Sequence, residues 1–163
     1  MRAPGRRRVA GDGGGASRRI ATFHLDELYL GIDVGVVQEV LRVQPLTRVP
    51  LAPSAVEGLL NLRGQIVTAI DLRRRFGMGA RPDGGMPMHV VVRTADGVVS
   101  LMVDEMDDVM ELPDALLGAT PATLDLPARE MLLGVYTLED RLLLLLDQER
   151  AAVVDDRDAQ RSH

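Results

Sequence analysis

Cysteine and tryptophan are absent from the sequence, and its 163 residues include only two phenylalanines and two tyrosines. Without cysteine the chain forms no disulfide, and it has no thiolate to serve as nucleophile or metal ligand. The scarcity of aromatic residues means that any core must be built from Leu, Val, Ile and Met. Lysine is absent as well, so all 19 basic residues are arginine.

Long hydrophobic runs are also absent. The longest run near the C-terminus, Leu142–Leu146, has five residues, whereas a membrane-spanning helix needs about 20. The N-terminus carries arginines but no apolar stretch of the kind that signal peptides contain. With 46% hydrophobic and 26% charged residues, the composition predicts a soluble, cytoplasmic protein that does not insert directly into membranes.

Charge is unevenly distributed along the chain. Residues 1–19 hold six arginines and one aspartate, a net charge of +5, so the remainder carries −10. An acidic body argues against a nucleic-acid partner. We expect residues 1–19 to form a disordered basic tail, residues 20–154 to form one domain, and residues 155–163 to form a polar C-terminal tail.

Short apolar runs separated by turn residues fill the region between the tails. About nine strands are expected, together with two or three brief helices. One helix is predicted over Val34–Val40 with Asp33 as its N-cap, and another over Leu72–Phe76 capped by Asp71. Short strands joined by frequent hairpins favour barrels or a sandwich over a doubly wound sheet. The sequence therefore predicts a mainly β fold of two small barrels side by side.

The stretch Glu57–Phe76 is predicted to be the centre of this fold. Its apolar runs Leu59–Leu62 and Ile66–Ile70 flank Arg63 and Gly64, which reads as strand, tight turn and strand. A guanidinium fixed on a rigid turn suits planar recognition of a carboxylate. An ordinary exposed arginine in a hairpin is the alternative.

Candidate catalytic and metal-binding groups form no recognisable constellation. The serines lack a G-x-S-x-G setting, and the acidic run Asp104–Asp108 lacks the ligand spacing of an EF-hand loop. We interpret that run as a solvated strand edge, and we expect no metal, no cofactor and no enzymatic activity. A small hydrolase or ligand-binding barrel that uses His24, His89 and Asp71 remains the alternative from another class.

Several motifs in sequence order carry a resemblance to a known family. They are Y-L-G-I-D-V-x-x-V-Q-E-V from Tyr29, V-E-G-L-L-N-L-R-G-Q-I-V-T-A-I-D-L from Val56, and L-G-V-Y-T-L-E-D-R-L-L-L-L-L-D from Leu133. With these motifs the chain resembles the CheW family of chemotaxis coupling proteins from about Ala21 to Val154. The resemblance implies a non-enzymatic adaptor of two packed, five-stranded, SH3-like barrels. It also implies two partners, the regulatory domain of a CheA-like histidine kinase and the cytoplasmic tip of a chemoreceptor, the latter held in a groove between the barrels.

The same resemblance implies a set of partner-binding positions. They are Val37, Glu39, Gly58, Arg63, Gly64, Val90 and Val91. Core burial is the alternative for the valines, and ordinary surface charge is the alternative for Glu39 and Arg63. Glu105, the triplet Arg73–Arg75 and the arginine-rich tail depart from the family pattern. These departures leave open a scaffold of another kinase array, such as one for twitching motility.

Overall fold

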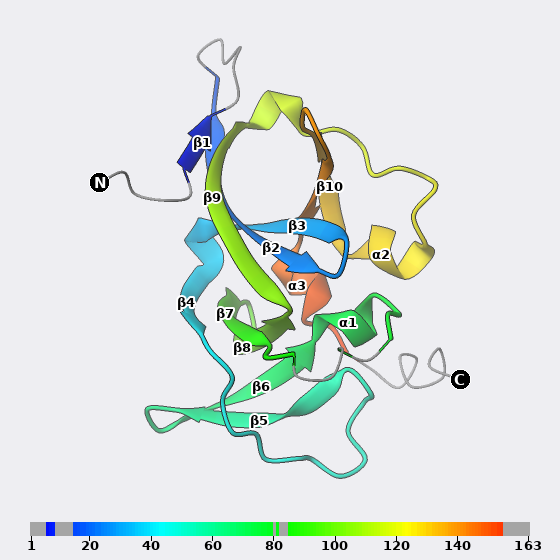
Figure 1. Cartoon of the computed structure of the whole chain (residues 1–163). Helices are drawn as coiled ribbons and strands as arrows, with labels where there is room; N and C mark the ends of the chain where they lie inside the picture. The colour runs from blue at the N-terminus through cyan, green and yellow to red at the C-terminus, as the bar shows by residue number, and fades with distance from the viewer. Residues whose placement is uncertain (1–5, 9–14, 80, 82–84, 155–163) are drawn as a thin grey trace.

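The computed structural model describes residues 6–8, 15–79, 81 and 85–154 (Figure 1). The described residues form strands, short α-helices and two 3-10 turns, and no α-helix exceeds five residues. The elements are β1 (Arg6–Arg8), β2 (Ser17–Leu25), β3 (Leu28–Asp33), η1 (Val34–Val36), β4 (Val37–Leu41), β5 (Val56–Leu62), β6 (Gln65–Asp71), α1 (Leu72–Arg75), β7 (Met88–Thr94), β8 (Gly97–Val103), β9 (Glu105–Pro113), η2 (Asp114–Leu116), α2 (Leu126–Glu130), β10 (Leu132–Thr137), β11 (Leu142–Leu146) and α3 (Gln148–Ala151).

The strands form two sheets. The first lobe has the order β1-β9-β2-β3-β11-β10, and the second lobe has the order β4-β7-β8-β6-β5. In Figure 1 the first lobe lies above the second, with α1 and α3 between them. The predicted class, mainly β with two five-stranded lobes and short helices, is confirmed, and β1 adds a sixth strand to the first lobe.

Three apolar clusters form the core. One is centred on Ile20, Tyr136 and Leu145 in the first lobe, and one on Leu60, Val67 and Met102 in the second. The largest cluster joins the lobes and draws on both sheets. Its buried members include Phe23, Leu30 and Ile32 from the first lobe and Ile70, Val90 and Leu101 from the second. The lobes are therefore held together by a continuous apolar interior.

The prediction of a helix over Val34–Val40 is wrong. Only Val34–Val36 coil, as a single 3-10 turn, and Asp33 caps it by accepting a hydrogen bond from Gly35 N at 2.8 Å. The chain then extends into β4, which pairs antiparallel with β7. Valine side chains are stiff at χ1 and pack well on pleated sheets, and here the available sheet edge outweighs the helical spacing.

The segment predicted as a disordered basic tail contains two strand segments. Arg6–Arg8 form β1, and Ser17–Arg19 begin β2 before the expected boundary at Ile20. The rest of residues 1–14, and the polar tail at 155–163, lie outside the described residues. The first lobe thus begins earlier in the chain than charge alone indicates.

Candidate functional site

Glu39 and Arg63 form a two-pronged ion pair in the second lobe. Arg63 Nη1 donates to Glu39 Oε2 at 2.8 Å, and Nη2 donates to Oε1 at 2.7 Å. The pair links edge strand β4 to the β5–β6 turn. Both were predicted to face a partner, and the structure shows that each already faces the other.

The β5–β6 turn holds Arg63 in place. Arg63 has φ 51° and Gly64 has φ 88°, as the tight turn of an antiparallel hairpin requires. Asn61 Oδ1 accepts the Gly64 N–H at 2.8 Å and closes the turn. The predicted strand-turn-strand arrangement around Arg63 is therefore confirmed.

The ion pair remains open to solvent on one side. The Arg63 side chain is 74% exposed, whereas that of Glu39 is 18% exposed. A guanidinium has five N–H donors, so the bonds to Glu39 leave others free to meet a partner's acceptors. Val40 and Ile66 are also exposed, at 40% and 60%, but Val40 follows Glu39 in β4 and so faces the other side of the strand. An exposed arginine held in one orientation is typical of a protein-binding surface, where arginine is enriched.

Gly58 acts through close packing rather than exposure. A Cβ at this buried position would lie 2.7 Å from Thr47 O, on the segment that bridges to Leu59. Gly58 therefore shapes the β5 side of the site, and the expectation that it touches a partner directly finds no accessible surface. Gly64 by contrast has open space around its Cα.

The three candidate valines belong to the core or its border. Val90 and Val91 are 1% and 0% exposed, so no partner side chain can reach them, which corrects the expectation of direct contact. They support the strand that carries Glu39, because Val91 of β7 pairs with Glu39 of β4 and Val90 pairs with Val40. Val37 is half-buried and packs against the shared cluster.

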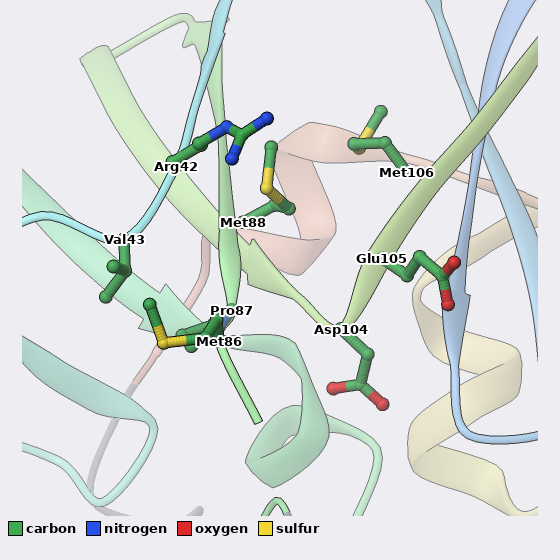
Figure 2. Close-up of a pocket in the computed structure, with 8 residues that line it drawn as sticks. All are labelled: Arg42, Val43, Met86, Pro87, Met88, Asp104, Glu105 and Met106. Carbon is green, nitrogen blue, oxygen red and sulfur yellow. The ribbon is translucent and has the colours of Figure 1, made fainter. Parts of the chain in front are cut away.

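A pocket of about 420 Å³ lies near the end of β4 (Figure 2). The residues that line it come from three separated segments: Arg42 and Val43 after β4, Met86–Met88 leading into β7, and Asp104–Met106 leading from β8 into β9. Figure 2 shows three methionine side chains along the wall and the two carboxylates at one end. Methionine-rich surfaces adapt to varied apolar partners. No local signal in the sequence brings these segments together.

Arg73, the first of the arginine triplet, is buried within an ionic cluster beside this pocket. Its Nε and Nη2 donate to Asp104 at 2.7 and 2.6 Å, its Nη2 also meets Asp26, and its Nη1 donates to Gly79 O at 3.1 Å. Arg81 adds a second cation on Asp104, at 3.0 Å. The cluster ties α1 of the second lobe to the β2–β3 turn of the first.

Asp104 was expected on a solvated strand edge, and this expectation is wrong. Burial by itself would raise the pKa of Asp104, but hydrogen bonds from Arg73, the Asp26 backbone and Arg81 outweigh it and lower the pKa. The hydrogen bond to Asp104 in turn raises the pKa of Arg73. Asp71 caps α1 as predicted, and its burial raises its pKa despite the nearby Arg81.

The residues of the hydrolytic alternative do not meet. His24 pairs with Asp107 at 2.9 Å, whereas His89 is 0% exposed and lies 2.7 Å from Ser100 Oγ. Burial lowers the pKa of His89, and the charge of Arg81 adds to this effect. Asp71 is engaged at the start of α1. Three separate hydrogen-bonded groups make no active site.

Comparison with known proteins agrees with this architecture. The CheW-like domain pattern matches residues 19–154. A chemotaxis protein CheW from Klebsiella aerogenes is 32% identical over 143 residues, which cover 88% of this chain and 85% of that protein. A chemotaxis protein CheW from Rhizobium meliloti is 27% identical over 142 residues, or 87% of this chain and 92% of that protein. The crystal structure of the scaffolding protein TtCheW from Thermoanaerobacter tengcongensis matches with a TM-score of 0.77 and 26% identity, over 88% of this chain and 97% of that one.

Two packed β lobes, a charged and partly apolar surface and an apolar pocket define a protein-binding scaffold. The chain belongs to the CheW-like family, as its motifs indicate, and is a non-enzymatic scaffold of chemotaxis signal transduction. In the described part of the chain, no helix has the length and hydropathy to cross a membrane.

Proposed function

We propose that this chain couples a CheA-type histidine kinase to the cytoplasmic tip of a chemoreceptor by holding both in fixed register in the cytoplasm. The kinase binds through its regulatory domain and the receptor through its helical tip. Coupling requires that the scaffold bind one state of the kinase–receptor assembly more tightly than another.

The Glu39–Arg63 pair is the observation that carries this proposal. It places a guanidinium, 74% exposed, in a fixed orientation on two hydrogen-bonded strands. A pre-oriented charge recognises a partner with less loss of side-chain freedom than a mobile one. The pair thus sets the orientation of the partner and thereby its register.

The methionine-lined pocket supplies the apolar part of the same interaction. β4 carries Glu39 and runs directly into Arg42 and Val43, which line the pocket. A helical receptor tip would place apolar side chains in such a pocket, in the helix-in-groove mode. Arg42 at one end and Glu105 at the other would fix the direction of the helix, since Asp104 is already engaged by Arg73 and Arg81.

Calorimetric titration with a kinase regulatory domain and a receptor-tip fragment tests the proposal. Arg63→Ala is expected to weaken binding by about 2 kcal/mol or more while the fold stays intact. Met86→Asp, at a pocket residue that is 68% exposed, is expected to weaken only the receptor interaction. Arg74→Ala, which removes an exposed arginine outside both features, is the matched control. Unchanged binding of both partners by Arg63→Ala would exclude this pair from the interface.

The pathway can be tested separately. Co-precipitation from the source cells should recover a CheA-like kinase together with chemoreceptors. Recovery of a different kinase array would leave the scaffold function in place and reassign the pathway.

A further inference from the structure

The arginine-rich N-terminal strand lies on the outer edge of β9. β1 lies beside β9 (Figure 1) and pairs with it in parallel. The register places Arg6, Arg7 and Arg8 opposite Val109, Met110 and Glu111. The opposite edge of β9 pairs antiparallel with β2 over most of its length. Among the described strands, β1 is therefore the only one that pairs with the outer edge of β9.

A strand edge without a neighbour presents unpaired backbone N–H and C=O groups to any extended chain. Removal of β1 would make β9 the terminal strand of the first lobe. The edge would then be available for strand addition, in which backbone hydrogen bonds give affinity and side chains give specificity.

Charge determines which extended chains fit this edge. β9 has the sequence E-M-D-D-V-M-E-L-P, with four acidic residues and no basic one. β1 consists of three arginines, and no acidic residue precedes it in the sequence. Opposite charges on neighbouring strands stabilise pairing, whereas like charges oppose it. The edge is thus selective for basic segments.

The contact between β1 and β9 is short enough to exchange. β1 has three residues and pairs in parallel, the less stable arrangement per residue. It persists because the tail is tethered, which gives it an effective concentration in the millimolar range. A longer basic segment on another protein would form more backbone hydrogen bonds and displace it.

We propose that the outer edge of β9 is a second docking site, specific for a basic extended segment of a partner protein, and that Arg6–Arg8 occupy it as an intramolecular competitor. The site lies in the first lobe and the Glu39–Arg63 pair in the second, so it does not rest on the proposed kinase and receptor coupling.

A peptide of the chain's own first ten residues, MRAPGRRRVA, serves as the probe in NMR titrations. The full chain is compared with the full-length variant Arg6→Glu/Arg7→Glu/Arg8→Glu, whose tail cannot compete. We expect the peptide to shift the amides of Val109–Glu111 and to bind this variant roughly tenfold more tightly than the wild type. Higher ionic strength should weaken the binding. A peptide with glutamates in place of its four arginines is the control.

Equal affinity for the two proteins, or no shift at millimolar peptide, would overturn the proposal. So would a wild-type dimer that dissociates on tail charge reversal, because the edge would then serve strand exchange between two copies.

The absence of cysteine allows a second test in the full chain. Arg6→Cys/Val109→Cys places two cysteines at paired positions of neighbouring strands, close enough for a disulfide. Arg6→Cys/Glu105→Cys is the out-of-register control. The first pair should cross-link readily on oxidation and then exclude the peptide, and reduction should restore binding. Equal cross-linking of both pairs, or undiminished peptide binding by the oxidised protein, would contradict the proposal.

Discussion

Two arginines of one stretch of chain lie in opposite environments. Arg63 lies at the tip of the β5–β6 hairpin with its side chain 74% exposed, and Arg73 lies at the start of α1 with its side chain 3% exposed. Both donate two hydrogen bonds to a single carboxylate. The two arginines differ in burial. We expect a buried ion pair to stabilise the fold and an exposed one to be accessible to a partner.

Burial makes the Arg73 cluster a structural element. The Arg73 guanidinium is removed from water and Asp104 is largely buried, so each needs the other to offset the cost of desolvation, whereas Asp26 is half-exposed. In the Glu39–Arg63 pair the guanidinium keeps most of its hydration, since the Arg63 side chain is 74% exposed, and we expect the pair to contribute little to stability. The proposed role of the pair is to orient a partner, and the comparison with Arg73 leads to predictions that separate stability from binding.

The largest effect is expected for Arg73→Met, which leaves Asp104 and Asp26 without their shared cation. Removal of one member of a buried ionic cluster should lower the free energy of unfolding by about 3–5 kcal/mol. The neighbouring exposed Arg74 gives the control, because Arg74→Met should change the free energy of unfolding by less than about 1 kcal/mol. Urea denaturation followed by circular dichroism measures both. Equal effects at the two positions would show that burial does not distinguish them.

The second-largest effect on stability is expected for one of two glycines in the β5–β6 hairpin. Gly58→Ala brings a Cβ within 2.7 Å of Thr47 O and should lower the free energy of unfolding by about 1–3 kcal/mol. Gly64→Ala meets no neighbour and is disfavoured only by its φ of 88°, which amounts to about 1 kcal/mol. Thermal denaturation of the two variants ranks them, and a reversed order would contradict the packing assigned to Gly58.

The buried His89 predicts a pH dependence that an exposed site would not have. Its pKa is lowered in the folded state, so below the ordinary value of 6.5 the unfolded chain binds a proton first. The contribution of His89 to the free energy of unfolding is therefore fully present above pH 6.5. It falls as the pH drops toward the folded-state pKa, by at most about 1.4 kcal/mol per pH unit. His89→Gln should flatten this slope in urea unfolding. Parallel curves for wild type and variant would contradict it.

The smallest effect on stability is expected at Glu39 and Arg63. A double-mutant cycle of the two alanine variants should give a coupling energy of about 0.2–1 kcal/mol in the free protein. Urea unfolding of the four proteins measures this energy. A coupling energy comparable to that of the Arg73 cluster would make the pair structural.

The sequence predicts the local elements well. Alternating apolar residues and turn dipeptides identify the hairpins, and Asp33 and Asp71 cap the turns that follow them. The valine spacing after Asp33 is misleading because it fits one face of a helix, whereas β4 turns Val37 toward the core and leaves Val40 exposed.

The long-range contacts are beyond reach of sequence patterns. Asp26, Arg73 and Asp104 are far apart in the chain and meet only because the two lobes pack together. Glu39 and Arg63 are each implied by the family motifs, but no local signal indicates that they pair. The methionines of the pocket likewise come together only in the folded protein.

The central claim is that Arg63 serves binding whereas Arg73 serves the fold. The most direct test measures, for Arg63→Ala, both the free energy of unfolding and the affinity for the kinase regulatory domain and the receptor tip. We predict a change in stability of less than about 1 kcal/mol together with a loss of partner affinity of about 2 kcal/mol or more. Lost stability with unchanged affinity for both partners would contradict the account.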